Sequence, residues 1–78
     1  QTKYTSYPNP VSNVFHINSA NANIKSVEIF NSLGKSVKQV EVNDSKADIE
    51  VNNLSAGIYF AKISNKKGGL STVKMIKN

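Results

Sequence analysis

A turn followed by a β-strand can be read from ten consecutive residues, Leu54-Ser55-Ala56-Gly57-Ile58-Tyr59-Phe60-Ala61-Lys62-Ile63. Gly57 suits the turn, and the alternation after it places Tyr59, Ala61 and Ile63 on one face of an extended strand. A tyrosine at the start of such a strand can donate its hydroxyl proton to backbone a few residues upstream while its ring packs in the core. We therefore predict that Tyr59 has a structural role, not a catalytic one.

The same short alternation recurs along the chain, and Asn, Ser, Gly or Asp interrupt it roughly every eight to twelve residues. This rhythm predicts strands at residues 4–7, 14–18, 24–30, 36–42, 47–51, 58–63 and 70–76, with turns or loops at 21–23, 31–34, 43–46 and 65–69. The inward-facing residues are expected to be Phe15, Ile17, Val27, Ile29, Ile49 and Val51. The predicted fold class is all-β, a seven-stranded immunoglobulin-like antiparallel β-sandwich.

Two local signals predict how the chain bends. Asn31-Ser32-Leu33-Gly34 is typical of a type I turn, in which Gly34 suits a positive φ or a bulge. Val37 points away from the face of its neighbours, which predicts a bulge or a strand switch there. Pro8 and Pro10 fix φ and remove two backbone donors. We expect the chain to cross from one sheet to the other at this segment. The alternative, a rigid exposed ligand segment, offers little surface.

Composition excludes several classes of function. The 78 residues carry a net charge of +5, all ten basic residues are lysines, and there is no cysteine. Without arginine forks or a basic stripe with stacking aromatics, no nucleic-acid partner is expected. Without cysteine there is no disulfide or thiolate site. No apolar run approaches the roughly 20 residues of a transmembrane segment.

No catalytic or metal constellation is predicted, so we expect a domain that is not an enzyme and has no cofactor. His16 is the only histidine, and alternation places it opposite Phe15, on an exposed face. Asp44, Asp48 and Glu50 have oxygens that calcium accepts, but their spacing lacks the density of a dedicated calcium loop. Asp48 and Glu50 fit a solvated strand face better.

An ordered set of motifs resembles the type A C-terminal sorting domain of the type IX secretion system, also called the Por secretion system, of Bacteroidota. The set covers residues 7–78 and consists of Pro8, Pro10 and Phe15; Val27, Ile29, Gly34, Lys35 and Val37; Leu54, Gly57, Tyr59, Ala61 and Ile63; and Lys74, Met75, Ile76 and Lys77. Two positions depart from the pattern. Asn31 stands where aspartate is common, and Ala61 where a larger apolar residue is common.

The resemblance implies a secretion signal and not a catalyst. Residues 1–6 would be a linker or first strand from an upstream cargo domain, and residues 7–78 the sorting domain. The domain would direct the covalently attached cargo across the outer membrane to the cell surface or medium. Its partners would be the outer-membrane type IX machinery and a sortase-like peptidase, which would cut near or before residues 1–7. The suspected recognition residues are Lys74, Met75, Ile76 and Lys77.

Two other functions fit a small secreted sandwich. One is an immunoglobulin-like stalk or adhesion module, which can occupy any position in a protein, whereas an address of this kind is terminal. The other is a small carbohydrate-binding module that uses Tyr4, Tyr7 or Phe60 as stacking platforms. An exposed coplanar pair of aromatic rings would favour it.

Overall fold

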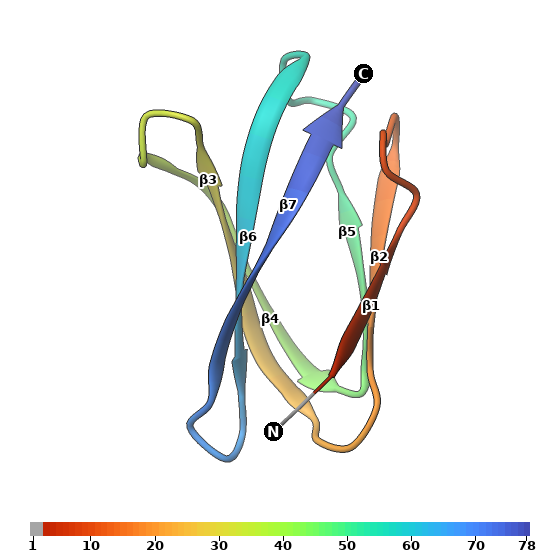
Figure 1. The fold of residues 1–78 in the computed structure, drawn as a ribbon, viewed down its shortest axis with the longest axis vertical. Helices are drawn as coiled ribbons and strands as arrows, with labels where there is room; N and C mark the ends of the chain where they lie inside the picture. Colours follow the sequence, from red (N-terminus) through yellow and green to blue (C-terminus); the bar gives the residue numbers. More distant parts are fainter. Residues whose placement is uncertain (1–2) are drawn as a thin grey trace.

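Alternation of apolar and polar residues produces seven strands in the computed structural model, which describes residues 3–78 (Figure 1). They are β1 (Tyr4–Tyr7), β2 (Val14–Ser19), β3 (Ile24–Asn31), β4 (Ser36–Asp44), β5 (Lys46–Glu50), β6 (Gly57–Asn65) and β7 (Leu70–Lys77). The predicted strands are confirmed to within two residues at each end. The predicted linker or first strand at residues 1–6 lies partly in β1, and its residues 1 and 2 lie outside the described residues.

Two antiparallel sheets make up the sandwich. One has the order β1-β2-β5 and the other β4-β3-β6-β7. The all-β sandwich is therefore confirmed. The fourth strand pairs with β3, whereas a constant-type immunoglobulin domain places its fourth strand beside the fifth. A tight turn between β3 and β4 explains this, because it leaves β4 no length of chain with which to cross to the other sheet.

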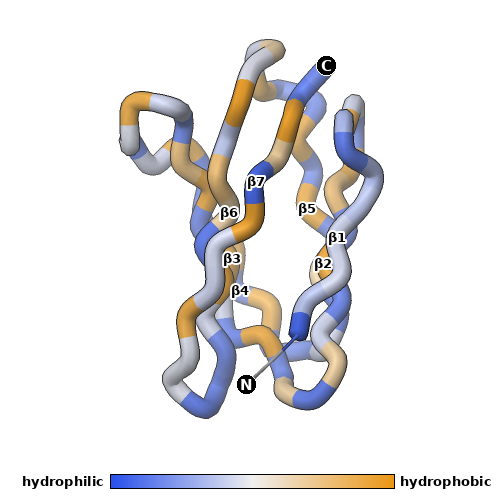
Figure 2. The backbone as a smooth tube through the Cα atoms, viewed as in Figure 1, coloured by the Kyte–Doolittle hydropathy of each residue, from blue (hydrophilic) through white to orange (hydrophobic). Residues whose placement is uncertain are grey.

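The core lies between the sheets, and in Figure 2 the hydrophobic and hydrophilic residues alternate along the strands. The predicted inward residues are all buried: Phe15, Ile17, Val27, Ile29, Ile49, Val51, Ala61 and Ile63. Val51 lies just beyond β5, where its N–H donates to the Asn13 carbonyl at 2.7 Å. Each large buried side chain contributes about 1.5–3 kcal/mol to folding.

The turn after β3 has the predicted chemistry. The Gly34 N–H donates to the Asn31 carbonyl at 3.0 Å, and φ of Gly34 is +84°, a conformation that glycine adopts without steric cost. The predicted bulge at Val37 is also confirmed, because Ile29 opposes Lys38 while Phe30 opposes Ser36. Val37 is the extra residue.

The predicted loop at residues 43–46 is wrong. β4 continues to Asp44, β5 begins at Lys46, and only Ser45 lies between them. The strand continues because Asn43 adopts a positive φ of 56° and a second register shift lies beside it, between Ile24 and Ser26 of β3. Asparagine tolerates this left-handed conformation better than most residues.

The proline segment passes the chain between the sheets, as predicted. β1 belongs to the three-stranded sheet, whereas Val11 forms a parallel bridge with Lys77 at the edge of the four-stranded sheet. The peptide bonds before Pro8 and Pro10 are both cis.

Candidate functional site

The suspected recognition residues lie at the end of β7, an edge strand of the four-stranded sheet. Lys74 and Ile76 are exposed on the outer face, Met75 is fully buried, and Lys77 is half-buried. Lys74 and Ile76 therefore present side chains to a partner, while Met75 holds the strand to the core.

Residues 9–11, which we call the clasp, lie along the outer edge of this part of β7. The Asn9 side chain donates to the Lys74 carbonyl at 3.0 Å and accepts the Ile76 N–H at 2.8 Å, as a backbone peptide would. The Val11 N–H then donates to the Ile76 carbonyl at 2.7 Å, and its carbonyl accepts the Asn78 N–H at 2.9 Å. The outward backbone groups from the Lys74 carbonyl to the Asn78 N–H are thus already paired and are not free to bind a partner strand.

Sequence analysis missed Asn9, although it lies between the two prolines that marked the segment. Val11 is fully buried and anchors the clasp in the core. An asparagine flanked by residues that cannot donate a hydrogen bond is the signal that could have been used. The side chain of Asn9 supplies the donor and acceptor that the neighbouring prolines cannot both supply.

Tyr59 and its hydrogen bond to the turn before β6, which we call the Tyr59 corner, lie beside the same end of β7, on the side of β6. The Tyr59 hydroxyl donates to the Ser55 carbonyl at 2.7 Å, and the residue is 7% exposed, which confirms the predicted hydrogen bond to upstream backbone and the burial of the ring. Tyr59 pairs with Met75, and Gly57, whose φ is +155°, pairs with Lys77. Leu54 packs half-buried against the core.

Large apolar side chains gather on the outer face of β6 and β7. Ile58 opposes Ile76 and is 44% exposed, while Phe60 opposes Lys74 and is 39% exposed. Phe30, on β3, opposes Phe60 on the other side. The sequence pattern placed Ile58 and Phe60 on the outward face but gave no reason for apolar residues there.

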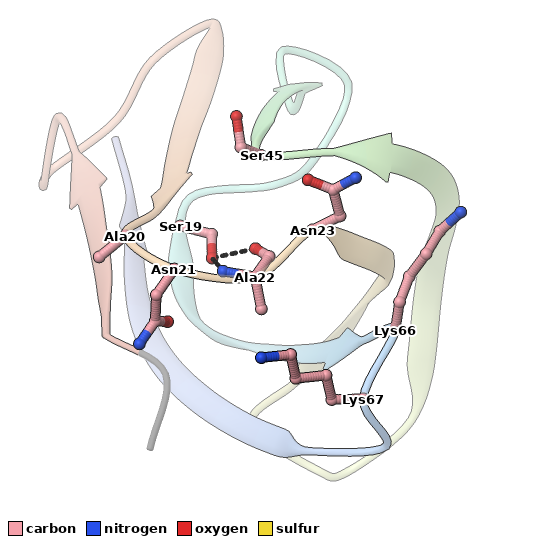
Figure 3. Close-up of a pocket in the computed structure, with 8 residues that line it drawn as sticks. All are labelled: Ser19, Ala20, Asn21, Ala22, Asn23, Ser45, Lys66 and Lys67. Atoms are coloured by element: carbon pink, nitrogen blue, oxygen red, sulfur yellow. Dashed lines mark hydrogen bonds between the residues drawn. The ribbon is translucent and has the colours of Figure 1, made fainter.

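An open pocket of about 500 Å³ lies at the opposite end of the sandwich, where three loops meet (Figure 3). The residues that line it are Ser19, Ala20, Asn21, Ala22, Asn23, Ser45, Lys66 and Lys67. The Ser19 hydroxyl donates to the Ala22 carbonyl and accepts the Ala22 N–H, so it is occupied within its own turn. Lys67 extends toward that turn, whereas Lys66 extends away from it (Figure 3). The two ammonium groups therefore do not point to a common position in the pocket.

The outer face of the three-stranded sheet carries the only histidine. His16 Nδ1 lies 2.6 Å from Asp48 Oδ1, and the His16 ring lies 5.0 Å from the Tyr7 ring at an interplanar angle of 31°. Tyr7 is 47% exposed, but Tyr4 is half-buried with its hydroxyl 3.4 Å from the Asn65 amide. Tyr4 and Tyr7 therefore do not form a coplanar exposed pair.

Two other kinds of functional feature are absent from residues 3–78. This part of the chain holds no group of three or more His, Cys, Asp or Glu side chains that could bind a metal ion. It also holds no helix of the length and apolarity needed to cross a membrane.

The family described as the secretion system C-terminal sorting domain matches residues 5–78. The chain belongs to this family. The resemblance drawn from the motifs is thereby confirmed.

The chain matches a small part of the length of two known proteins. An ulvan lyase from Nonlabens ulvanivorans is 32% identical over 73 residues, which are 92% of this chain and 14% of the lyase. A solved structure of PorZ, a surface component of the type IX secretion system of Porphyromonas gingivalis, matches 96% of this chain and 11% of its own at a TM-score of 0.77. At a sequence identity of 18%, this structural likeness shows the fold alone.

Proposed function

We propose that this domain is an address that directs a covalently attached N-terminal cargo across the outer membrane through the type IX secretion machinery. The observation that carries the proposal is the family match over residues 5–78, since members of this family are secretion sorting domains. The protein that carries the domain is accordingly a secreted or cell-surface protein. PorZ supports this, because it is a surface component of the type IX system, and the ulvan lyase shows that a similar segment occurs within an enzyme.

The domain acts as a ligand of the machinery and not as a catalyst. Within residues 3–78 the His16–Asp48 pair has no hydrogen bond to a serine, threonine or tyrosine hydroxyl, and an acid–base pair alone does not make a hydrolase. The peptidase chemistry belongs to a partner. A sortase-like peptidase at the surface removes the domain by cutting near or before residues 1–7.

Recognition involves the end of β7, where Lys74 and Ile76 project from the outer face. Met75 contributes by burial, which fixes which side chains face outward. Lys77 is half-buried, and its ammonium group donates to the Asn78 carbonyl at 3.0 Å. We expect the Lys74 ammonium group to provide most of the charge that a partner meets.

Export of a fluorescent cargo tests the proposal. The cargo is fused to the 78-residue chain in a host with a type IX apparatus, and the cells are fractionated. Deleting residues 74–78 is a poor test because it removes buried Met75 and all four clasp hydrogen bonds. A double substitution, Lys74→Gln with Lys77→Gln, removes the charges, and surface changes of this kind usually alter stability by no more than about 0.5 kcal/mol.

The matched control is Lys25→Gln with Lys46→Gln, since both lysines are exposed and lie outside β7. We expect the control to reach the surface and the β7 variant to accumulate in the periplasm. Equal delivery by both variants would exclude Lys74 and Lys77 as recognition residues. Retention of the unsubstituted fusion in the periplasm would instead favour a stalk. The mass of the exported cargo reports whether the domain has been removed and where.

A further inference from the structure

The outer edge of β7 has two parts, which differ in whether their backbone groups are paired. The Ile76 N–H and carbonyl both bond to the clasp, so both point away from β6. In an antiparallel ladder this orientation recurs at every second residue. The backbone groups of Thr72 and Leu70 therefore also point away from β6, because the register of β6 and β7 runs without a shift from Gly57–Lys77 to Ser64–Leu70.

The clasp covers this edge only from the Lys74 carbonyl onward. No strand within residues 3–78 pairs with the outer edge from residue 70 to the Lys74 N–H, which we call the open edge. Its outward donors and acceptors include the N–H and carbonyl of Thr72 and the N–H of Lys74.

The three other sheet edges carry features that discourage pairing with another chain. β1 is four residues long, β4 has two register shifts, and β5 is five residues long with charged side chains at three of them. The open edge has none of these features. It reads Leu-Ser-Thr-Val, without charge or proline, and its pairing with β6 is regular. An edge left regular and uncharged in this way is suited to accept a strand.

We propose that the open edge binds an extended segment of a partner protein by β-strand addition, and that this segment carries a carboxylate at its Lys74 end. The side chains that flank the added strand specify its chemistry. Leu70 is 65% exposed and offers an apolar contact. Lys74 is exposed at the other end, and the only salt bridge found in residues 3–78 joins His16 and Asp48, so the Lys74 ammonium group is available to a carboxylate.

Lys74 is the cation that the added segment would meet. Lys62 on β6 pairs with Thr72 and is also exposed, but its ammonium group lies 5.8 Å from the centre of the Phe30 ring on β3, on the side of β6 away from the open edge. The clasp sets the length of the added strand, because Asn9 already occupies the Lys74 carbonyl. The inference rests on the proposed function only in assigning the segment to the export machinery.

A synthetic seven-residue peptide tests the pairing without any export apparatus. The peptide alternates valine and threonine and has a glutamate at each end, so that either strand direction brings a carboxylate to Lys74. It is titrated into the isotope-labelled 78-residue chain and followed by nuclear magnetic resonance. We expect the amide signals of Thr72 and Lys74 to shift and their exchange with solvent to slow, because both N–H groups become paired.

Two variants form a matched pair. Thr72→Pro removes an N–H that the β6–β7 ladder does not use, and proline is tolerated at such edge positions. Thr72→Val keeps that N–H and the shape of the side chain. We expect proline to abolish peptide binding and valine to preserve it. Lys74→Gln should weaken binding about twofold to fivefold, the effect of one exposed ion pair.

Three results would overturn the proposal. The first is a set of peptide-induced signal shifts that fall outside the open edge. The second is an equally strong response to a peptide with lysine in place of glutamate. The third is a concentration-dependent shift of the Thr72 and Lys74 signals without peptide, which would assign the edge to a second copy of the chain. If Thr72→Pro fails to fold, the exchange of the Thr72 and Lys74 amide protons with solvent, measured in the unsubstituted chain with and without peptide, still tests the proposal.

The export assay separates this inference from the proposed function. If Thr72→Pro folds and blocks peptide binding but the fusion still reaches the surface, the edge is not the address, while the sorting function stands. If the unsubstituted fusion is not exported, the sorting function fails, whatever the peptide shows. We expect export of Thr72→Val and periplasmic retention of Thr72→Pro.

Discussion

Two turns of the four-stranded sheet are built by the same hydrogen bonds but lie in different surroundings. Asn31 begins the turn between β3 and β4, and Asn65 begins the turn between β6 and β7. In each, the side-chain oxygen accepts the N–H groups two and four residues later, at 2.8–3.0 Å. In each, the fourth residue is a glycine with positive φ, +84° at Gly34 and +88° at Gly68.

The surroundings differ in solvent exposure and in space. Asn31 is half-buried in a turn whose Leu33 is 91% exposed, whereas Asn65 is 6% exposed and its amide reaches Tyr4 of the other sheet. The position after the glycine is Lys35 in the first turn and Gly69 in the second. The comparison teaches that local sequence makes the turn, while packing decides how much the turn contributes to stability.

The largest effect is expected for Asn65→Ala, which should lower the free energy of unfolding by about 3 kcal/mol. Two N–H groups lose their acceptor, and such a loss costs most where water cannot replace it. Urea denaturation measures this change. Asn65→Asp retains an acceptor oxygen and serves as the control, with a smaller expected loss. If Asn65→Ala lowered the free energy of unfolding no more than Asn31→Ala does, burial would not explain the difference expected between the two turns.

The second effect concerns the space beside Asn65. A Cβ atom at Gly69 would lie 2.7 Å from Asn65 Nδ2, so the buried amide would have to move. We expect Gly69→Ala to cost about 2 kcal/mol, as overpacking usually does. The matched change at the open turn, Lys35→Ala, should stay within about 0.5 kcal/mol. Similar urea midpoints for these two variants would show that the second turn is not tightly packed.

Asn31→Ala should cost only about 1 kcal/mol, because water can bond to the N–H groups that the exposed turn leaves without an acceptor. The side-chain hydrogen bonds of Asn31 would then contribute about a third as much to the free energy of unfolding as those of Asn65. Thermal unfolding of the two alanine variants, recorded side by side, checks this ratio. Equal shifts would mean that the two turns contribute equally despite their different burial.

The turn at Asn31, the bulge at Val37 and the Tyr59 corner could be predicted from sequence because each depends on residues a few positions apart. Local chemistry did not reveal the continuation of β4 past Asn43, since only the register with β3 makes room for its positive φ. The pattern of alternation gave the core faces of the strands for the same local reason.

The clasp is the part of the candidate site that sequence did not predict. Asn9 bonds to backbone atoms of Lys74 and Ile76, 65 and 67 residues later in the chain. Neither periodicity nor spacing encodes such a contact, because an amide side chain can mimic a peptide group at any exposed strand edge. The assignment of Lys74, Met75, Ile76 and Lys77 to recognition remains a prediction.

The smallest effect is expected at the contact that joins the second turn to the other sheet. Asn65 Nδ2 donates to the Tyr4 hydroxyl at 3.4 Å, which is long for a hydrogen bond, and the Tyr4 ring packs against the core independently of that hydroxyl. Tyr4→Phe keeps the ring, so we expect it to cost about 0.5 kcal/mol, the lower end of the range for a hydrogen bond. A double-mutant cycle of Tyr4→Phe with Asn65→Ala isolates the contact. A coupling energy near zero would show that the second turn is stabilised by its own sheet alone, and that burial rather than the bond to β1 distinguishes it from the turn at Asn31.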